Sequence, residues 1–346
     1  MLLCVGLPGC AGVGPSRLRS DLLPYAEAIA DSQKRQVLLN IVRVRYGDMP
    51  TFLAVNQVLS SYTLEQHGEL GFNLFPNARE GNTGTGLGSV TFSDRPTTTF
   101  SPLSGERLSR SAVQPPSPAE LLPLVQVGKP IDLLFRLSVQ SIGPLRNMVV
   151  LGGEQAEAAG DPRFFELLTE MRRLQVAGLL TVRFVRRKDS NQVFLGITDT
   201  SDRELQAVVV GVRRLLGMAP GQTEAEVVYG SVSSGPRQIA ILTRPLIAAL
   251  SQVSEEIEVP PADVEAGRTV AFSRLSSLGL KPIITVHSGS AAPADAETAV
   301  TYGRSWFWID QNDYNSKVAY NILMLLAATM TAAPAGQGPV LAVPAG

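Results

Sequence analysis

Two carboxylates near the C-terminal end, Asp310 and Asp313, have a spacing that could support acid/base catalysis or calcium binding. Both lie where a predicted strand gives way to a predicted helix. At such a junction an aspartate commonly closes the turn or accepts hydrogen bonds from the free amide groups of the helix N-terminus. We therefore expect a turn residue and a helix N-cap. An acid/base pair of a hydrolase is the alternative.

The sequence lacks the other patterns of catalytic, metal and cofactor sites. Its two cysteines, Cys4 and Cys10, and two histidines, His67 and His287, are too few for a zinc or iron–sulfur site. No GxSxG or SxxK motif is present. The glycine-rich segment 84–88 lacks the lysine and the strand–helix context of a phosphate-binding loop, so we expect a flexible loop. We predict no catalytic residue, no metal site and no cofactor.

The most specific pattern lies at the N-terminal end, where Leu7-Pro8-Gly9-Cys10 has the form of a bacterial lipobox. An apolar residue stands three positions before the cysteine, and the small glycine directly before it gives a signal peptidase access to the bond. The Cys10 thiol would accept the lipid and become the first mature residue. No Lys or Arg precedes it, which favours a start codon upstream of Met1. Ala11, in place of Asp, favours export to the outer membrane.

The composition is that of a globular protein with no electrostatic attraction to nucleic acid. The chain has 346 residues, of which 45% are hydrophobic, and a net charge of −1. A nearly neutral chain has no excess of cations to neutralise phosphates. The most apolar stretch, 322–328, is far shorter than the roughly 20 residues that a membrane-spanning helix needs. We expect a membrane attachment through the lipid alone.

The domain organisation that the sequence predicts has four parts. Residues 1–20 are a signal peptide with its lipobox and a tether. Residues 21–150 form an α+β domain with a long, loop-rich insertion at 71–130, where glycine and proline are frequent. Residues 161–330 form a second α+β domain, and the uncharged tail 331–346 is expected to be disordered.

Hydrophobic periodicity predicts elements that alternate between helices and antiparallel strands. The first domain is predicted to contain a helix over 21–45, strands over 51–64, 89–92, 97–100 and 133–142, and a short helix over 119–127. The second begins with two helix–hairpin units, each a helix followed by two strands. In the first unit Asp161 caps the helix and the hairpin covers 180–197. In the second, Ser201 and Glu204 make a capping box.

The hairpin of the second unit covers 224–232 and 238–242, and Pro245 opens a third helix. Strands over 282–287, 298–302 and 304–310 and a helix after Asp313 complete the chain. The predicted fold class is therefore α+β, with helices packed on antiparallel sheets.

Four residues near the ends of these elements could contact a ligand or a partner. Trp306 and Trp308 share one face of a strand, where they could stack on a sugar or grip a protein if they were exposed. We expect them to lie in the core. Arg43 and Arg45 precede a predicted turn and could bind an anion, although a solvated or salt-bridged helix end is the expectation.

Three segments resemble an uncharacterised family of proteobacterial outer-membrane lipoproteins. They are residues 38–48 (LLNIVRVRYGD), 95–105 (RPTTTFSPLSG) and 306–310 (WFWID), the last with Ser316-Lys317 after it. The resemblance extends from Leu22 to Leu326 and implies an envelope location without implying an activity. The family pattern has a second acidic residue after Asp310, where this chain has Gln311, and that difference argues against a carboxylate cluster.

The sequence thus predicts a lipid-anchored protein on the periplasmic face of the outer membrane. Its expected role is binding or scaffolding in an envelope assembly, with an envelope protein as partner and no catalysis. The candidate interaction residues are Trp306, Trp308, Asp310, Arg43 and Arg45. Two alternatives stay open: an envelope hydrolase that uses Asp310 and Asp313, and a soluble protein whose Cys10 is fortuitous.

Overall fold

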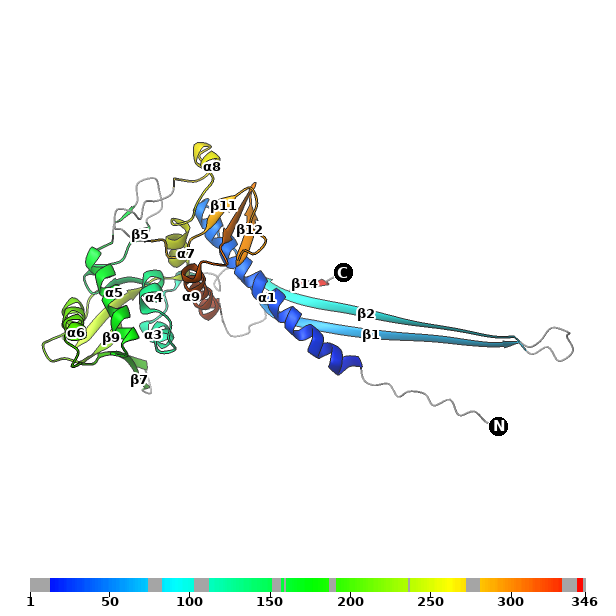
Figure 1. The fold of residues 1–346 in the computed structure, drawn as a ribbon, viewed down its shortest axis with the longest axis horizontal. Helices are drawn as coiled ribbons and strands as arrows, with labels where there is room; N and C mark the ends of the chain where they lie inside the picture. The colour runs from blue at the N-terminus through cyan, green and yellow to red at the C-terminus, as the bar shows by residue number, and fades with distance from the viewer. Residues whose placement is uncertain are drawn as a thin grey trace. The chain divides into compact units, whose positions relative to one another are not determined.

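The computed structural model of the chain describes residues 13–73, 83–102, 112–150, 157–158, 160–186, 191–235, 237–271, 281–331 and 341–344. The fold is α+β, as predicted, with mixed and antiparallel sheets (Figure 1). Contacts group the chain into two units. One holds Met1–Ile29, Leu53–Leu103 and Ala335–Gly346, and the other holds Ala30–Phe52 and Ser104–Pro334. This division differs from the predicted domains 21–150 and 161–330. Helix α1 (Val13–Arg45) contributes residues to both units.

The first unit contains a two-stranded antiparallel ribbon of β1 (Leu53–Asn73) and β2 (Thr83–Pro102). A short strand near the C-terminal end, β14 (Leu341–Pro344), pairs with the base of β2. The strands predicted over 89–92 and 97–100 lie within β2, but the loop predicted over 84–88 was wrong, because Gly84, Gly86 and Gly88 lie in the ladder opposite β1. Glycine is rare in strands, so its frequency suggested a loop. The strand at 341–344 likewise differs from the predicted disordered tail.

A six-stranded sheet organises the second unit, in the order β4-β3-β10-β9-β8-β7. Its strands are β3 (Val139–Ile142), β4 (Leu145–Arg146), β7 (Leu180–Arg186), β8 (Asn191–Ile197), β9 (Glu224–Tyr229) and β10 (Gln238–Thr243). The predicted first hairpin is confirmed, since β7 and β8 pair antiparallel. The predicted second hairpin was wrong, because β9 and β10 pair in parallel. The Ser/Gly-rich connection between them returns the chain to the starting end of β9, so Gln238 lies opposite Glu226.

The second unit also holds eight-residue and longer helices, the short helix α8 and two very short strands. They are α3 (Pro118–Gln126), α4 (Ile131–Ser138), α5 (Pro162–Val176), α6 (Arg203–Leu215), α7 (Leu246–Ser254), α8 (Pro261–Glu265), α9 (Tyr314–Thr331), β5 (Val149–Val150) and β6 (Glu157–Ala158). The strand predicted over 133–142 was wrong in its first part, which is helix α4. Its buried positions Ile131, Leu134, Phe135 and Ser138 recur at the three- and four-residue spacing of a helix. Among the described residues, no helix is long and apolar enough to cross a membrane.

Helix caps follow the sequence closely, with one shift. The side chain of Asp161 accepts a hydrogen bond from the amide of Arg163 at the start of α5, as predicted. At the start of α6, however, Asp202 is the N-cap and accepts from the amides of Glu204 and Leu205. The predicted cap, Ser201, is one position too early. A carboxylate at Asp202 satisfies two of the orphan amides of the helix, which a serine one residue earlier cannot reach.

We therefore expect Asp202→Ala to lower the free energy of unfolding by about 1 kcal/mol, as is typical for the loss of an N-cap. The matched control Ser201→Ala should change it by less than about 0.5 kcal/mol. Urea unfolding followed by far-UV circular dichroism measures both variants. A larger effect from Ser201→Ala than from Asp202→Ala would show that the cap is assigned to the wrong residue.

Candidate interaction site

A small three-stranded sheet presents the most distinctive surface of the second unit. Its strands are β11 (His287–Gly289), β12 (Thr298–Tyr302) and β13 (Ser305–Ile309), with β13 in the centre. The predicted strands over 298–302 and 304–310 are confirmed. Only His287 of the predicted strand 282–287 is in β11. The amides of Ile283 and Thr285 donate to Glu256 and Ser316, and the carbonyl of Val286 accepts from Glu258.

The two tryptophans lie on the accessible face of this sheet. Phe307 and Ile309 are fully buried, whereas Trp306 is 37% exposed and Trp308 is partly exposed. Alternation along a strand puts the two pairs on opposite faces. The prediction that Trp306 and Trp308 share a face is therefore confirmed, and the prediction that they lie in the core was wrong. The smaller Phe307 and Ile309 fill the core side.

Neighbouring strands complete an aromatic face around these rings. We define the aromatic face as Trp306, Trp308, His287, Gly289 and Thr301, which the register places side by side. The His287 ring lies 5.8 Å from the Trp308 ring at a tilt of 34°. A Cβ atom at Gly289 would lie only 3.2 Å from Cη2 of Trp308, so the indole lies across the backbone of β11 at this point. The glycine leaves room for a flat ring.

One carboxylate fixes the histidine of this face. Nδ1 of His287 is 3.1 Å from Oε1 of Glu258, on the segment that follows α7. The amide of Glu258 in turn donates to the carbonyl of Val286, 2.9 Å away, directly before β11. The face therefore joins apolar rings with a polar edge, the combination that aromatic residues provide at protein interfaces.

The buried side of the sheet packs on the end of α1. The Tyr46 ring meets the Phe307 ring edge-on at 6.1 Å and the Tyr302 ring at 4.7 Å. The Tyr302 hydroxyl donates to the carboxylate of Asp48, and the Tyr46 hydroxyl donates to that of Asp263. The segments 38–48 and 306–310, far apart in the sequence, therefore meet at this sheet. Sequence reasoning missed Tyr46, Tyr302 and Asp263. The sequence signal for Tyr46 is its position directly before Gly47. That glycine ends the helix with a φ of 78°.

Burial and these carboxylates keep both hydroxyls protonated. Burial, together with Asp48, raises the pKa of Tyr302 to about 12. Burial and the hydrogen bond to Asp263 raise the pKa of Tyr46 well above its usual value, and the same bond lowers the pKa of Asp263. Both tyrosines therefore remain hydrogen-bond donors near neutral pH, and they hold the sheet rather than perform chemistry.

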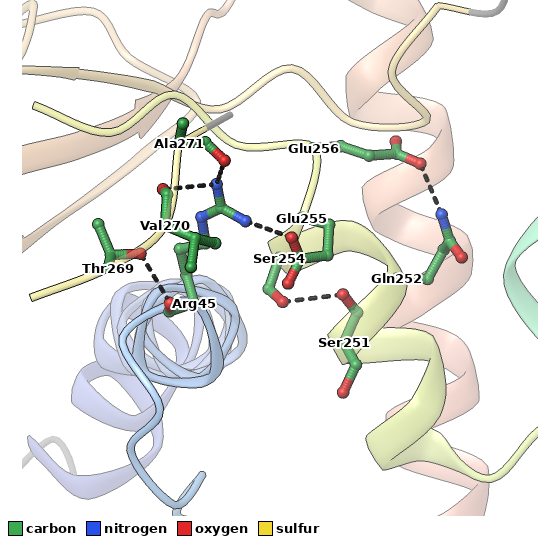
Figure 2. A network of polar contacts seen from close by, with 9 residues as sticks. All are labelled: Arg45, Ser251, Gln252, Ser254, Glu255, Glu256, Thr269, Val270 and Ala271. Carbon is green, nitrogen blue, oxygen red and sulfur yellow. Dashed lines mark hydrogen bonds and ion pairs between the residues drawn. The ribbon is translucent and has the colours of Figure 1, made fainter. Parts of the chain in front are cut away.

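Arg45 lies beneath this junction and is buried. Its side chain has no exposed surface, and its Nη1 lies 2.5 Å from Oε2 of Glu255, the C-cap of α7. Its Nη2 donates to the carbonyls of Val270 and Ala271 at 3.2 and 2.9 Å, and Thr269 donates to the Arg45 carbonyl (Figure 2). The guanidinium is thus occupied by the protein itself, so Arg45 is a salt-bridged helix end. An anion would have to displace Glu255 to bind there.

The Arg43 side chain, by contrast, makes one hydrogen bond within the described part of the chain. Its Nη1 donates to the Thr51 hydroxyl at 2.6 Å, and the side chain is partly exposed. The two arginines predicted as one anion site therefore have different roles.

A second buried polar network holds the segment that enters β11. Glu256 is 2% exposed and accepts hydrogen bonds from the side chain of Gln252 at 3.0 Å and from the amide of Ile283 at 2.5 Å (Figure 2 shows the first of these). Burial raises the pKa of Glu256, and burial lowers the pKa of nearby Arg244 to about 10. Both shifts come mainly from burial. Gln252 links the two groups, since its side-chain oxygen accepts from Arg244 at 3.3 Å and its side-chain nitrogen donates to Glu256.

Asp310 and Asp313, the two predicted acidic residues, both accept hydrogen bonds from backbone amides. Asp310 accepts a hydrogen bond from the amide of Asn312 at 2.7 Å, and Asp313 accepts from the amide and hydroxyl of Ser316 at 3.0 and 2.6 Å. Burial alone would raise the pKa of Asp313, but the hydrogen bonds from Ser316 lower it below its usual value. An acid/base pair needs one carboxyl group with a raised pKa. This arrangement favours the turn and the N-cap over the hydrolase.

The rest of the described chain offers little else for chemistry. Within it, no three His, Cys, Asp or Glu side chains are grouped to hold a metal ion. A cavity of about 580 Å³ lies between the β3–β4 turn, α5 and the end of α6, with Arg163, Glu166 and Arg214 in its wall. Arg163 is already paired with Asp161 at 2.7 Å.

Comparison of the chain with protein-family models, curated proteins and solved structures finds no match. The function therefore has to be argued from the residues themselves. Of these, Cys10 lies outside the residues that the structure describes.

The different roles of the two arginines give a direct test. We expect Arg45→Met to lower the free energy of unfolding by about 3 kcal/mol, because Glu255 and two carbonyl groups lose their donor. The control Arg43→Met, which removes one partly exposed hydrogen bond, should cost less than about 1 kcal/mol. Denaturant unfolding of the purified variants compares them. Equal costs for the two substitutions would contradict a structural role specific to Arg45.

Proposed function

We propose that the chain is a lipid-anchored protein on the periplasmic face of the bacterial outer membrane, and that it binds an envelope protein through its aromatic face. The observation that carries the binding role is the position of Trp306 and Trp308 on the outer side of β13. Tryptophans are enriched among the residues that dominate interface energies.

The way the sheet is held supports this role. Phe307, directly between the two tryptophans, packs on Tyr46, and the neighbouring Tyr302 bonds to Asp48. The rings on the outer face therefore stand on a fixed base. A preorganised surface loses less conformational entropy on binding than a mobile one, which leaves more of the contact energy for affinity. Three short strands are smaller than a standard interface, so neighbouring residues must contribute to the contact.

The lipobox supports the anchor. A small Gly9 before Cys10 suits cleavage, and the thiol suits transfer of a diacylglycerol group. One acyl chain binds a membrane reversibly, whereas two or more anchor a protein stably. The hydrolase alternative is less well supported, because the hydrogen bonds of Asp310 and Asp313 to backbone amides occupy both groups.

The anchor is tested by replacing the cysteine. Cys10→Ala should move the protein, expressed from its own locus, from the outer-membrane fraction to the soluble fraction and abolish metabolic labelling with a palmitate analogue. Cys4→Ala is the matched control and should change neither result. Intact mass gives the first residue and its lipid. An unmodified wild-type chain in the soluble fraction would support the fortuitous cysteine instead.

The binding face is tested by crosslinking in the native cell. A photoreactive amino acid at Thr301, which is exposed beside Trp306, should give one heavier adduct. Trp306→Ala and Trp308→Ala together should remove it, because the partner loses its anchoring rings. Tyr314→Ala, which alters a 74% exposed aromatic residue outside the face, should leave the adduct unchanged. Persistence of the adduct without the tryptophans, in protein with an unaltered circular dichroism spectrum, would contradict the proposal.

A further inference from the structure

The two edges of the six-stranded sheet are unlike. Strand β4 at one edge has only two residues, and the carbonyl of Arg146 accepts a hydrogen bond from the amide of Asp161. Strand β7 at the other edge has seven residues, and its register with β8 runs without a bulge from Leu180 to Arg186. Proteins usually protect an edge of this length with a proline, a bulge or a covering segment, because its free backbone groups can pair with another chain.

The register identifies the backbone groups of β7 that point away from the sheet. The amide of Thr198 donates to the carbonyl of Leu179, and hydrogen-bonded pairs alternate along an antiparallel ladder. The residues whose amides and carbonyls point outward are therefore Leu180, Val182, Phe184 and Arg186. Within the described part of the chain, these outward groups make no hydrogen bond. The edge is open to a further strand.

The outward-pointing residues also continue the core side of the sheet. They lie opposite buried residues of β8, in the pairs Leu180–Ile197, Val182–Leu195 and Phe184–Val193. Residues opposite each other share a face, so these side chains of β7 belong to the apolar side. That side is incompletely covered at the edge, since Phe184 is 40% exposed and Leu180 and Val182 are partly exposed. A strand with apolar residues at alternate positions would cover them.

The charge at this edge favours an acidic partner over a second copy. Arg186 is exposed and forms no ion pair with a described residue, and the sequence continues Arg187-Lys188-Asp189, which keeps this end positive. Two β7 strands could join all their outward groups only in the antiparallel register that places Arg183 opposite Arg183. Like charges directly opposite each other destabilise a sheet.

We propose that β7 is a β-augmentation site, and that its occupant is an extended segment of a partner protein. The segment carries apolar residues at alternate positions and an Asp or Glu opposite Arg186. Its backbone bonds to the outward amides and carbonyls of β7, and its apolar side chains extend the core side of the sheet. Antiparallel pairing, the more stable arrangement, places the acidic residue at the N-terminal end of the segment. This inference is independent of the aromatic face and of the lipid anchor.

The first test uses the full chain with Cys4→Ala and Cys10→Ala, so that lipidation does not affect the result, and a fluorescein-labelled peptide, Glu-Thr-Val-Thr-Val-Thr-Val. Fluorescence anisotropy should show saturable binding, and hydrogen exchange measured by mass spectrometry should slow in residues 180–186. In the antiparallel arrangement the valine amides point toward β7 and the threonine amides point away.

N-methylation of the peptide supplies the matched control for backbone pairing. A methyl group on the middle valine amide should raise the dissociation constant more than about tenfold, because a hydrogen-bond donor to β7 is lost and the approach is blocked. A methyl group on the middle threonine amide should leave the dissociation constant unchanged. A parent peptide that does not bind, or binding that survives methylation of the valine, would overturn the proposal.

The second test reverses one charge. Arg186→Glu should raise the dissociation constant of the parent peptide about two- to fivefold and lower by a similar factor that of the peptide with Lys in place of Glu. Arg203→Glu, which alters an exposed arginine at the start of α6, should change neither value. Equal effects of the two substitutions would contradict an acidic residue opposite Arg186.

Sedimentation equilibrium separates this proposal from self-association through the same edge. Val182→Pro removes an outward amide and keeps the ladder with β8, since proline is tolerated on an edge strand whose amide faces solvent. This variant should lose peptide binding at an unaltered circular dichroism spectrum and should sediment like the parent chain. A parent dimer that Val182→Pro converts to a monomer would assign the edge to a second copy and overturn the proposal.

Discussion

The burial of one guanidinium group, that of Arg45, is the constraint on which the second unit depends. A charge without exposed surface is tolerated only when it is paired and hydrogen-bonded, and here Glu255 and two carbonyl groups meet that requirement. In meeting it, the protein brings the end of α1, the end of α7 and the segment around Val270 to one point. Tyr46, the next residue, then reaches Phe307 and Tyr302. The tryptophans are exposed because the residue between them is committed to this junction.

The aromatic face and the buried junction are therefore the two sides of one strand. Alternation buries Phe307 and Ile309 of β13 and leaves Trp306 and Trp308 on the accessible face. The same junction explains why Arg45 is a poor candidate for a ligand site. Arg45 is buried and paired within the core. The accessible surface nearby carries aromatic rings instead of a free positive charge.

The sequence alone predicts the parts of this fold that local chemistry decides. Asp161 caps α5, the hairpin of β7 and β8 forms, and Asp313 caps α9, because each depends on neighbours a few residues away. The wrong predictions concern elements whose structure depends on contacts between residues far apart in the sequence. The parallel pairing of β9 and β10 depends on where the rest of the sheet stands, and α4 resembles a strand until its buried positions are known. The exposure of the tryptophans could not be predicted, because alternation gives two faces without saying which is buried.

The long sequence separations at the junction set an order for folding. The partners of Arg45 and Asp48 lie 210 and 254 residues further along the chain, and β3 must wait for β10 before it has a neighbour on that side. Contacts of such separation are slow to form, because loop closure has to precede them. The end of α1 therefore gains its partners Glu255 and Tyr302 only after almost the whole chain has been made. Until those distant segments exist, the end of α1 has none of the partners that satisfy the buried Arg45 guanidinium.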